Sequence, residues 1–360
     1  MHKIKSWYSG LKKATKTDFA TYLGVILAFL IVFPLQQKGI LSRSVSGMLI
    51  PLCAYIVMAV SLNLTVGILG ELSLGHAGFM SVGAFSGIVT AMSLQSAIPS
   101  PAVRLCLAIV VGAVCAGVAG VIVGVPVLRL HGDYLAIVTL AFGEIIRDLI
   151  TCLLVGYDSR GLHVIFNASG SRTLEDLHLA EGGFAIIKGA QGATGTEKIS
   201  TFFAGFVLIM LTLIIVLNLV RSRSGRAIMA LRDNRIAAES VGINVTKYKL
   251  MGFITSAALA GAAGALYGLN YSNLSATKFD FNTSILVLVF VVLGGLGNIW
   301  GSIIATAVLY VLPEALRGFA DYRMLIYAIV LILVMLATNS DSVRNLYSRL
   351  FQRKEAERDA

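Results

Sequence analysis

The sequence predicts an all-α, polytopic membrane protein with about ten transmembrane helices. Of its 360 residues, 57% are hydrophobic and only 13% are charged, and the mean hydropathy is +0.83. The apolar residues form runs long enough to cross a bilayer, which takes about 20 residues at a rise of about 1.5 Å each. Basic clusters separate groups of these runs, as they do at the cytoplasmic flanks of membrane helices. These three observations exclude a soluble globular domain.

Ten windows of suitable length lie between polar, basic and proline-containing segments. In chain order they are residues 19–36, 46–68, 73–93, 104–126, 133–155, 201–220, 250–270, 283–297, 299–316 and 323–338. The first window follows a basic leader and resembles a secretory signal, but it ends in FPLQQ without a small-residue cleavage site. We therefore interpret it as a transmembrane helix.

The basic residues predict how these helices are oriented. The segment 1–18 carries five Lys or Arg, the segment 221–249 carries seven against two acids, and the segment 339–360 carries five against four. Six crossings separate the first cluster from the second and four separate the second from the third, so all three fit the cytoplasmic side. The transmembrane domain then spans 19–338, and 156–200 is its one sizeable extracytoplasmic segment.

The cytoplasmic segment 221–249 is expected to form one short helix with a docking face. Good helix formers run from 225 to 240, and Gly242 follows where a helix C-terminus is common. A charged stripe at i, i+3 and i+7 contains Arg232, Arg235 and Glu239. A neighbouring apolar strip contains Leu231, Ala238 and Val241. A helix lying on lipid headgroups is the alternative, although such helices favour uninterrupted Lys and Arg over interleaved acids such as Asp233.

Three charged residues lie inside the window 133–155. A charge at the bilayer centre costs about 2.5–3.5 kcal/mol on insertion scales, so Glu144, Arg147 and Asp148 should face protein or water. On a helix all three share one side, and Glu144 can pair with Arg147. A structural ion pair, a lining of the transport path and a proton relay are all compatible with this pattern.

Small residues recur at a spacing of four in three of the windows. They are Gly83 and Gly87, then Ala116, Gly120 and Gly124, then Ala260, Gly264 and Gly268. Such flat faces allow the backbones of neighbouring helices to approach closely. We interpret them as packing seams between helices.

Sequence signatures of enzymes are absent. The glycine cluster GAQGATGTEK at 189–198 lacks the Gly-Lys-Ser/Thr ending of a Walker A loop, and neither G-x-S-x-G nor H-E-x-x-H occurs. The four cysteines lie within windows without metal-ligand spacing. Uphill transport would therefore need an ion gradient or the energy of another subunit. The net charge of +10 is explained by the basic flanks and does not indicate nucleic acid.

Four long stretches resemble the permease subunits of branched-chain amino acid ABC importers, of the LivM type. They are LNLTVGILGELSLGHAGFMSVGA, HGDYLAIVTLAFGEIIRD, SGRAIMALRDNRIAAESVGINVTKYKL with ITSAALAGAAGALYG, and VVLGGLGNIWG with LPEALR. Together they cover most of the chain from Leu62 to Arg317. The resemblance implies a multi-pass protein of a bacterial inner membrane that binds no cofactor itself. ATP would be bound by two partner ATPase subunits, a LivH-like second permease or a second copy of the chain would complete the pathway, and an external protein would deliver the substrate.

The resemblance also implies roles for particular residues. The segment 225–242 matches the family's coupling helix, which docks on the ATPase, and its candidate coupling residues are Gly225, Arg226, Arg232, Asp233, Arg235, Glu239 and Gly242. Glycine breaks near 69–78 and 294–297 would offer backbone groups to a zwitterionic substrate. The candidate path residues are Gly70, Ser73, Gly75, His76, Gly78, Gly294, Gly295 and Gly297. Tight structural turns are the alternative interpretation. If the breaks line the path, leucine at Gly75 and Gly294 should block uptake while assembly stays intact.

The chain departs from the family pattern in two places. It carries KGAQGATG where relatives have a TGGPNGI-like stretch, and TNSDSVRN where an Arg-Pro-x-Gly segment is common. The first difference leaves the delivered substrate open. An ABC permease for urea or amides and an ion-driven secondary transporter therefore remain alternatives to an amino acid importer.

Overall fold

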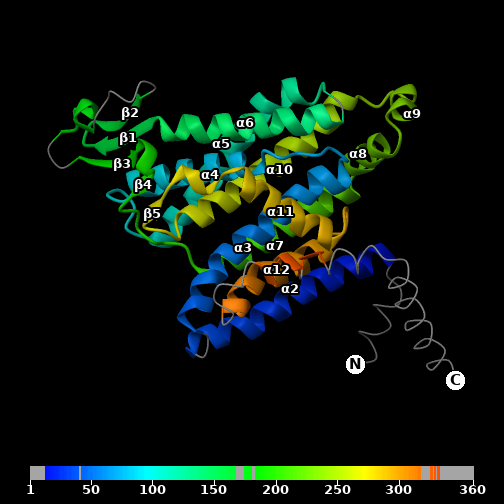
Figure 1. The fold of residues 1–360 in the computed structure, drawn as a ribbon, viewed down its shortest axis with the longest axis horizontal. Helices are drawn as coiled ribbons and strands as arrows, with labels where there is room; N and C mark the ends of the chain where they lie inside the picture. Colours follow the sequence, from blue (N-terminus) through cyan, green and yellow to red (C-terminus); the bar gives the residue numbers. More distant parts are fainter. Residues whose placement is uncertain are drawn as a thin grey trace.

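The computed structural model describes residues 13–39, 42–130, 132–167, 174–180, 183–317, 325–326, 328–329 and 331–332. Within them the chain forms a helical bundle with a small β-sheet at one end and the two helices α8 (Arg223–Asp233) and α9 (Arg235–Ser240) at the other (Figure 1). Most of the predicted tenth window, the tail 339–360 and the first twelve residues lie outside this described part.

Helices occupy the first nine predicted windows. They are α2 (Lys13–Gln37), α3 (Arg43–Asn63), α4 (His76–Ser93), α5 (Pro101–Val127), α6 (Asp133–Thr151), α7 (Phe202–Arg221), α10 (Val245–Gly268), α11 (Phe281–Gly294) and α12 (Ile299–Ala315). A π-helical turn, Leu64–Ile68, continues α3. Six helical segments of the described part are long and apolar enough to cross a membrane: Phe19–Gln37, Arg43–Ile68, Pro101–Val127, Phe202–Arg221, Val245–Gly268 and Ala276–Gly294. Helix α6 is not among them, and it carries four charged residues.

Capping residues set where several helices begin. The side chain of Thr201 accepts a hydrogen bond from Ala204 N at the start of α7. The side chain of Asn244 likewise accepts from Lys247 N at the start of α10, and that of Asp280 accepts from Thr283 N at the start of α11. Such caps satisfy N–H groups that have no partner within the helix. Helix α5 begins with Pro101, whose fixed φ suits the first helical position.

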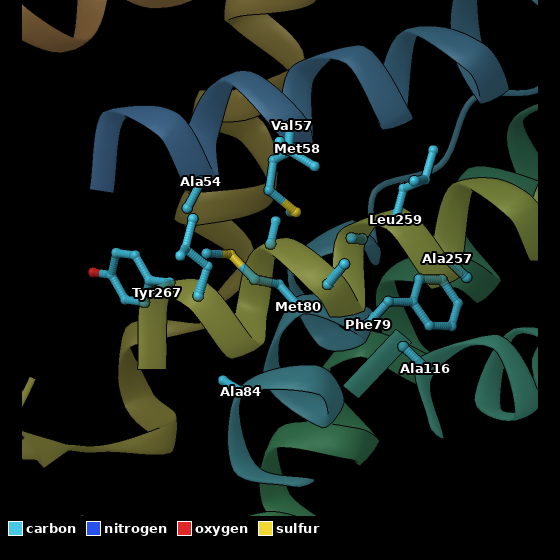
Figure 2. Packing of buried hydrophobic residues seen from close by; sticks show 14 of the residues in the cluster. Ala54, Val57, Met58, Phe79, Met80, Ala84, Ala116, Ala257, Leu259 and Tyr267 are labelled. Carbon is cyan, nitrogen blue, oxygen red and sulfur yellow. The ribbon is translucent and has the colours of Figure 1, made fainter. Parts of the chain in front are cut away.

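Helix α10 is the centre of the bundle and packs against α5, α4 and α3. A Cβ on Gly264 would lie 1.9 Å from the carbonyl oxygen of Met80, and one on Gly83 would lie 2.1 Å from that of Gly261. Figure 2 shows Met80 of α4 and Met58 of α3 directed into this core. The predicted packing seams are therefore confirmed, because the two backbones touch where only glycine fits.

The expected all-α fold is wrong at one end of the bundle. A five-stranded sheet lies there, with the order β2-β1-β3-β4-β5 and only antiparallel pairs. Its strands are β1 (Leu153–Asp158), β2 (Gly161–Phe166), β3 (Phe184–Lys188), β4 (Ala193–Thr194) and β5 (Asn273–Leu274). The predicted apolar window continues to residue 155, whereas α6 ends at Thr151. Runs rich in β-branched and aromatic residues, LLVGYD, GLHVIF and FAIIK, favour strands once main-chain partners are available.

Asp158 fixes the turn between β1 and β2. Its buried carboxylate accepts hydrogen bonds from Ala180 N at 3.0 Å and Arg160 N at 2.7 Å, and it lies 3.1 Å from His163 Nε2. The Ala180 N–H above all, with that of Arg160 and the His163 ring, lowers the pKa of Asp158 from 3.8 to about 2, against the opposing effect of burial. The carboxylate therefore stabilises this turn above about pH 4, and the stabilisation is lost as the pH falls towards 2.

We expect Asp158→Asn to loosen this turn already at pH 4, because an amide cannot accept all of these bonds. Pepsin digestion of the detergent-solubilised protein measures the effect. Between pH 4 and pH 2, cleavage within 159–183 should accelerate in the native chain, relative to an unfolded substrate. The variant should be cut severalfold faster than the native chain at pH 4, and equal rates at that pH would contradict this role.

Candidate coupling and translocation site

The predicted docking segment forms two helices rather than one. Helix α8 ends at Asp233 and α9 begins at Arg235. Asn234 between them has an extended backbone (φ −154°, ψ 104°), and its side chain accepts a hydrogen bond from Ala237 N at 3.1 Å. An asparagine that caps a new helix in this way interrupts the preceding one. The single helix expected from 225 to 240 is therefore wrong, and the segment turns at Asn234.

The predicted charged stripe divides between the two helices. Arg235 Nε donates to Glu239 Oε1 at 3.0 Å, an i,i+4 pair on α9. Arg232 instead donates from Nη1 to the carbonyl oxygen of Gly67 at 2.9 Å, while its Nη2 pairs with Asp233 Oδ1 at 3.0 Å. The two arginine side chains are similarly exposed, 40% for Arg232 and 38% for Arg235. Arg232 differs because it also contacts Gly67 of the π-helical turn.

The apolar strip also differs from the expectation. Leu231 and Ala238 are buried, together with Ile228, whereas Val241 is 75% exposed. Ile236 of α9 is 80% exposed, the largest exposed fraction among the large hydrophobic side chains of the described residues. The sequence analysis missed Ile236, although an isoleucine among polar neighbours in RDNRIAAES was the available signal. The short segment that carries the Arg235–Glu239 pair thus also presents two exposed apolar side chains, Ile236 and Val241.

The remaining predicted coupling residues have structural contacts. A Cβ on Gly225 would lie 2.2 Å from a carbonyl oxygen of α7, so glycine permits the close turn from α7 into α8. Arg226 Nη1 donates to the carbonyl oxygen of Arg221 at 3.1 Å, across the same turn. Gly242 lies just beyond α9 with φ +85°, as predicted for a helix C-terminus.

The first glycine break lies between the π-helical turn and α4, where the backbone is irregular. A Cβ on Gly75 would lie 1.9 Å from the carbonyl oxygen of Thr139, and one on Gly78 would lie 2.9 Å from Gly143 Cα. These glycines therefore hold the start of α4 against α6. Leucine at Gly75 would collide with this backbone, so the expectation that such a variant assembles normally conflicts with the packing. A role in the transport path stays a prediction.

The polar side chains of this break are enclosed. His76 is buried, and its Nε2 lies 2.8 Å from Ser61 Oγ. Ser73 Oγ and Thr65 Oγ1 are buried and have no hydrogen-bond partner in this structure. Buried hydroxyls without a partner are uncommon and costly. These hydroxyls are enclosed by protein in this structure, and their role in a transport path stays a prediction.

The second glycine break joins α11 to α12 and lies against the π-helical turn that precedes the first break. Gly295 and Gly297 have φ of +93° and +81°, and a Cβ on Gly294 would lie 2.5 Å from the backbone of α12. Gly297 N donates to Asn63 Oδ1 at 2.8 Å. A Cβ on Gly67 would lie 2.2 Å from Gly297 N. The second predicted break is therefore in contact with the end of α3 and its π-helical turn, which immediately precede the first predicted break.

The charged triad of α6 is paired. Arg147 Nη1 lies 2.6 Å from Glu144 Oε2, and its Nη2 lies 3.0 Å from Asp148 Oδ1. Glu144 Oε1 also accepts a hydrogen bond from Phe281 N at 3.1 Å, at the first residue of α11. A carboxylate at a helix N-terminus is favourable, so these contacts support the structural interpretation of the triad, as a brace between α6 and α11.

Three long-range polar contacts were missed in the sequence. Lys249 of α10 forms an ion pair with Glu71, and their side chains are 7% and 12% exposed. Arg104 of α5, itself 4% exposed, pairs with Glu197 at 2.9 Å. Asn63, at the end of α3, accepts a hydrogen bond from Gly297 N of the second glycine break. Each is a polar residue within or beside an apolar window, which was the available signal, but its partner lies too far along the chain to be inferred.

Comparisons with known proteins place the chain in a family. The family described as "Branched-chain amino acid transport system / permease component" matches residues 44–335. The high-affinity branched-chain amino acid transport system permease protein LivM of Escherichia coli (strain K12) is 34% identical over 321 residues, 87% of this chain and 73% of the relative. LivM of Salmonella typhimurium is 35% identical over the same shares. A probable LivH of Methanocaldococcus jannaschii is 32% identical over 38% of this chain and 45% of the relative. No solved structure matches.

These matches agree with the resemblance seen in the four sequence stretches. They extend over nearly all of the helical bundle, and the relatives are membrane transport components rather than enzymes. They favour neither a secondary transporter nor a urea permease. The chain belongs to the permease family of branched-chain amino acid transport systems, and it is of the LivM type.

Proposed function

We propose that the chain is one permease subunit of a bacterial ABC importer for branched-chain or related amino acids. The match to LivM proteins over 87% of the chain is the observation that carries this proposal. Ten crossings would place both termini in the cytoplasm of a multi-pass inner-membrane protein. The chain would bind no cofactor, and ATP would act on its partners. The selectivity for leucine, isoleucine, valine or another amino acid would depend largely on a separate external binding protein.

The two ends of the bundle support this orientation. The sheet lies at one end and α8 with α9 at the other, as expected if 156–200 is external and 221–249 is cytoplasmic (Figure 1). Helix α2, which follows the basic N-terminus, begins at the α8–α9 end (Figure 1). Positively charged flanks are typical of the cytoplasmic side. We therefore propose that two ATPase subunits dock at the α8–α9 end.

The second permease of the importer would be a LivH-like protein or another copy of this chain. The partial match to LivH of Methanocaldococcus jannaschii supports the first, because two related permeases could then form the pathway together. In either arrangement the α9 surface, with Ile236, Val241 and the Arg235–Glu239 pair, would be the part of this chain that enters an ATPase cleft. Exposed apolar side chains next in sequence to an arginine pair are a composition common in protein interfaces.

We expect the double variant Arg235→Glu, Ile236→Asp to lose at least tenfold of the ATPase that co-purifies with the importer, with a matching loss of leucine uptake. Reversing the rim charge and inserting a carboxylate at the interface centre both disfavour binding. The matched control, Arg160→Glu with Val164→Asp, makes the same changes on exposed residues of the sheet end. Equal ATPase recovery from both variants would reject this docking surface.

A further inference from the structure

Arg232 joins α8 to the π-helical turn that ends α3. Its Nη1 donates to Gly67 O at 2.9 Å, across 165 positions of sequence. Its aliphatic part covers Gly70, where a Cβ would lie 2.5 Å from Arg232 Cγ and where φ is +77°. Only a residue without a side chain both adopts this backbone conformation and leaves room for the arginine. The contact therefore depends on both residues: Arg232 supplies the hydrogen bond, and Gly70 leaves the space for its side chain.

The acceptor is suited to a guanidinium. Gly67 lies in the last turn of a helical segment, where carbonyl groups have no partner within the helix and carry partial negative charge. Arg235, by comparison, makes its 3.0 Å contact with Glu239 of its own helix. Arg232 and Arg235 thus have different positions, although the sequence places them together.

The π-helical turn is in turn joined to the start of α12. Asn63 Oδ1 accepts from Gly297 N at 2.8 Å, and Asn63 Nδ2 donates to Ser302 Oγ at 2.9 Å. Gly67 and Gly297 are in backbone contact, as described above. A displacement of Gly67 therefore cannot leave Gly297 in place. Through Arg232, one side chain of α8 is connected to helices from both halves of the chain.

We propose that Arg232 is a positioning residue that transmits the movement of α8 to the two glycine breaks. We call it a strut, because its side chain connects α8 to the π-helical turn beside the glycine breaks and does not itself bind the ATPase. The proposal rests on the proposed function, because an ATPase must move α8. Removal of the strut should leave docking intact, since the exposed α9 surface is unchanged. It should instead uncouple the two activities, so that the ATPases still hydrolyse ATP but the substrate is no longer transported.

The assembled importer in proteoliposomes tests this, with tritiated leucine as the transported probe. In Arg232→Ala we expect normal ATPase recovery, ATP hydrolysis within about twofold of the native complex, and uptake reduced at least tenfold. Arg232→Lys retains a cationic donor and should restore part of the uptake. Arg223→Ala removes an exposed arginine from the same helix and should transport normally.

A second variant keeps Arg232 but fills the space at Gly70 against which its side chain packs. Gly70→Ala should reproduce the uncoupling, and adding it to Arg232→Ala should lower uptake no further. The matched control is Gly132→Ala, because Gly132 also has a positive φ of +60° but no atom within 4 Å of a new Cβ. The control also places a side chain at a positive φ, but without the arginine contact.

The outcomes separate the two proposals. Loss of ATPase recovery in Arg232→Ala would make Arg232 a docking residue and overturn the strut while the proposed function stands. Native uptake in Arg232→Ala would overturn it as well. If the native chain recruits no ATPase, the proposed function fails first and the strut fails with it. Uncoupling in both Arg232→Ala and Gly70→Ala, but not in Gly132→Ala, supports the strut.

Discussion

Substituting methionine for Lys249 is expected to lower the free energy of unfolding by about 3–5 kcal/mol, the usual cost of leaving one member of a buried ion pair unpaired. Lys249 and Glu71 are 7% and 12% exposed at the side chain, so the stranded carboxylate would have little access to water. The apparent melting temperature of the detergent-solubilised protein, followed by intrinsic fluorescence, measures the loss.

Two further variants distinguish the ion pair from simple packing. Lys249→Met combined with Glu71→Gln removes both charges and should recover most of the stability, because no unpaired charge remains. Lys247→Met changes an exposed lysine two positions earlier and should have little effect. If the double variant were as unstable as Lys249→Met alone, the interaction between the two charges would not contribute to stability.

Leucine at Gly264 is expected to lower the free energy of unfolding by more than about 4 kcal/mol and to abolish accumulation of folded protein. Its Cβ alone would lie 1.9 Å from Met80 O, so α4 and α10 would have to separate along their length. Fluorescence-detected size-exclusion of a tagged chain measures the folded fraction. Gly75 meets a backbone oxygen at the same distance, and leucine there should give the same result.

The control for this prediction is Gly47→Leu. Gly47 lies within α3, yet a Cβ there would have no atom within 4 Å, so the variant changes a helical glycine without creating a clash. It should accumulate like the native chain. If Gly264→Leu accumulated equally well, the backbone contact between α4 and α10 would not be as close as the structure has it.

The sequence predicted those features that depend on local pattern. Nine helices follow from the length of apolar runs, and the seams around Gly83 and Gly264 follow from a spacing of four. The pairing of Glu144 with Arg147 follows from their separation on one helix. In each of these cases the deciding information lies within a few turns of helix, where periodicity and spacing fix the geometry.

Features that depend on a distant partner were not predictable in this way. The strand LLVGYD continues an apolar run, and only its hydrogen-bonded neighbours distinguish it from the end of a helix. Arg232 and Arg235 lie three positions apart and look equivalent until Gly67 is placed beside one of them. The break at Asn234 depends on whether its side chain caps the following turn or faces solvent, which helix propensity does not decide.

The short strands β4 and β5 fasten the outer ends of two regions of sequence about 80 positions apart, through Ala193 opposite Leu274 and Thr194 opposite Asn273. The hydrogen bonds of such a pair are made by main-chain N–H and C=O groups, which every residue except proline carries. Exposed positions of the two strands can thus change while these main-chain bonds remain. If the sheet end meets the external binding protein, as the proposed orientation implies, its surface can adapt to a different binding protein without a change in the helix contacts of the bundle.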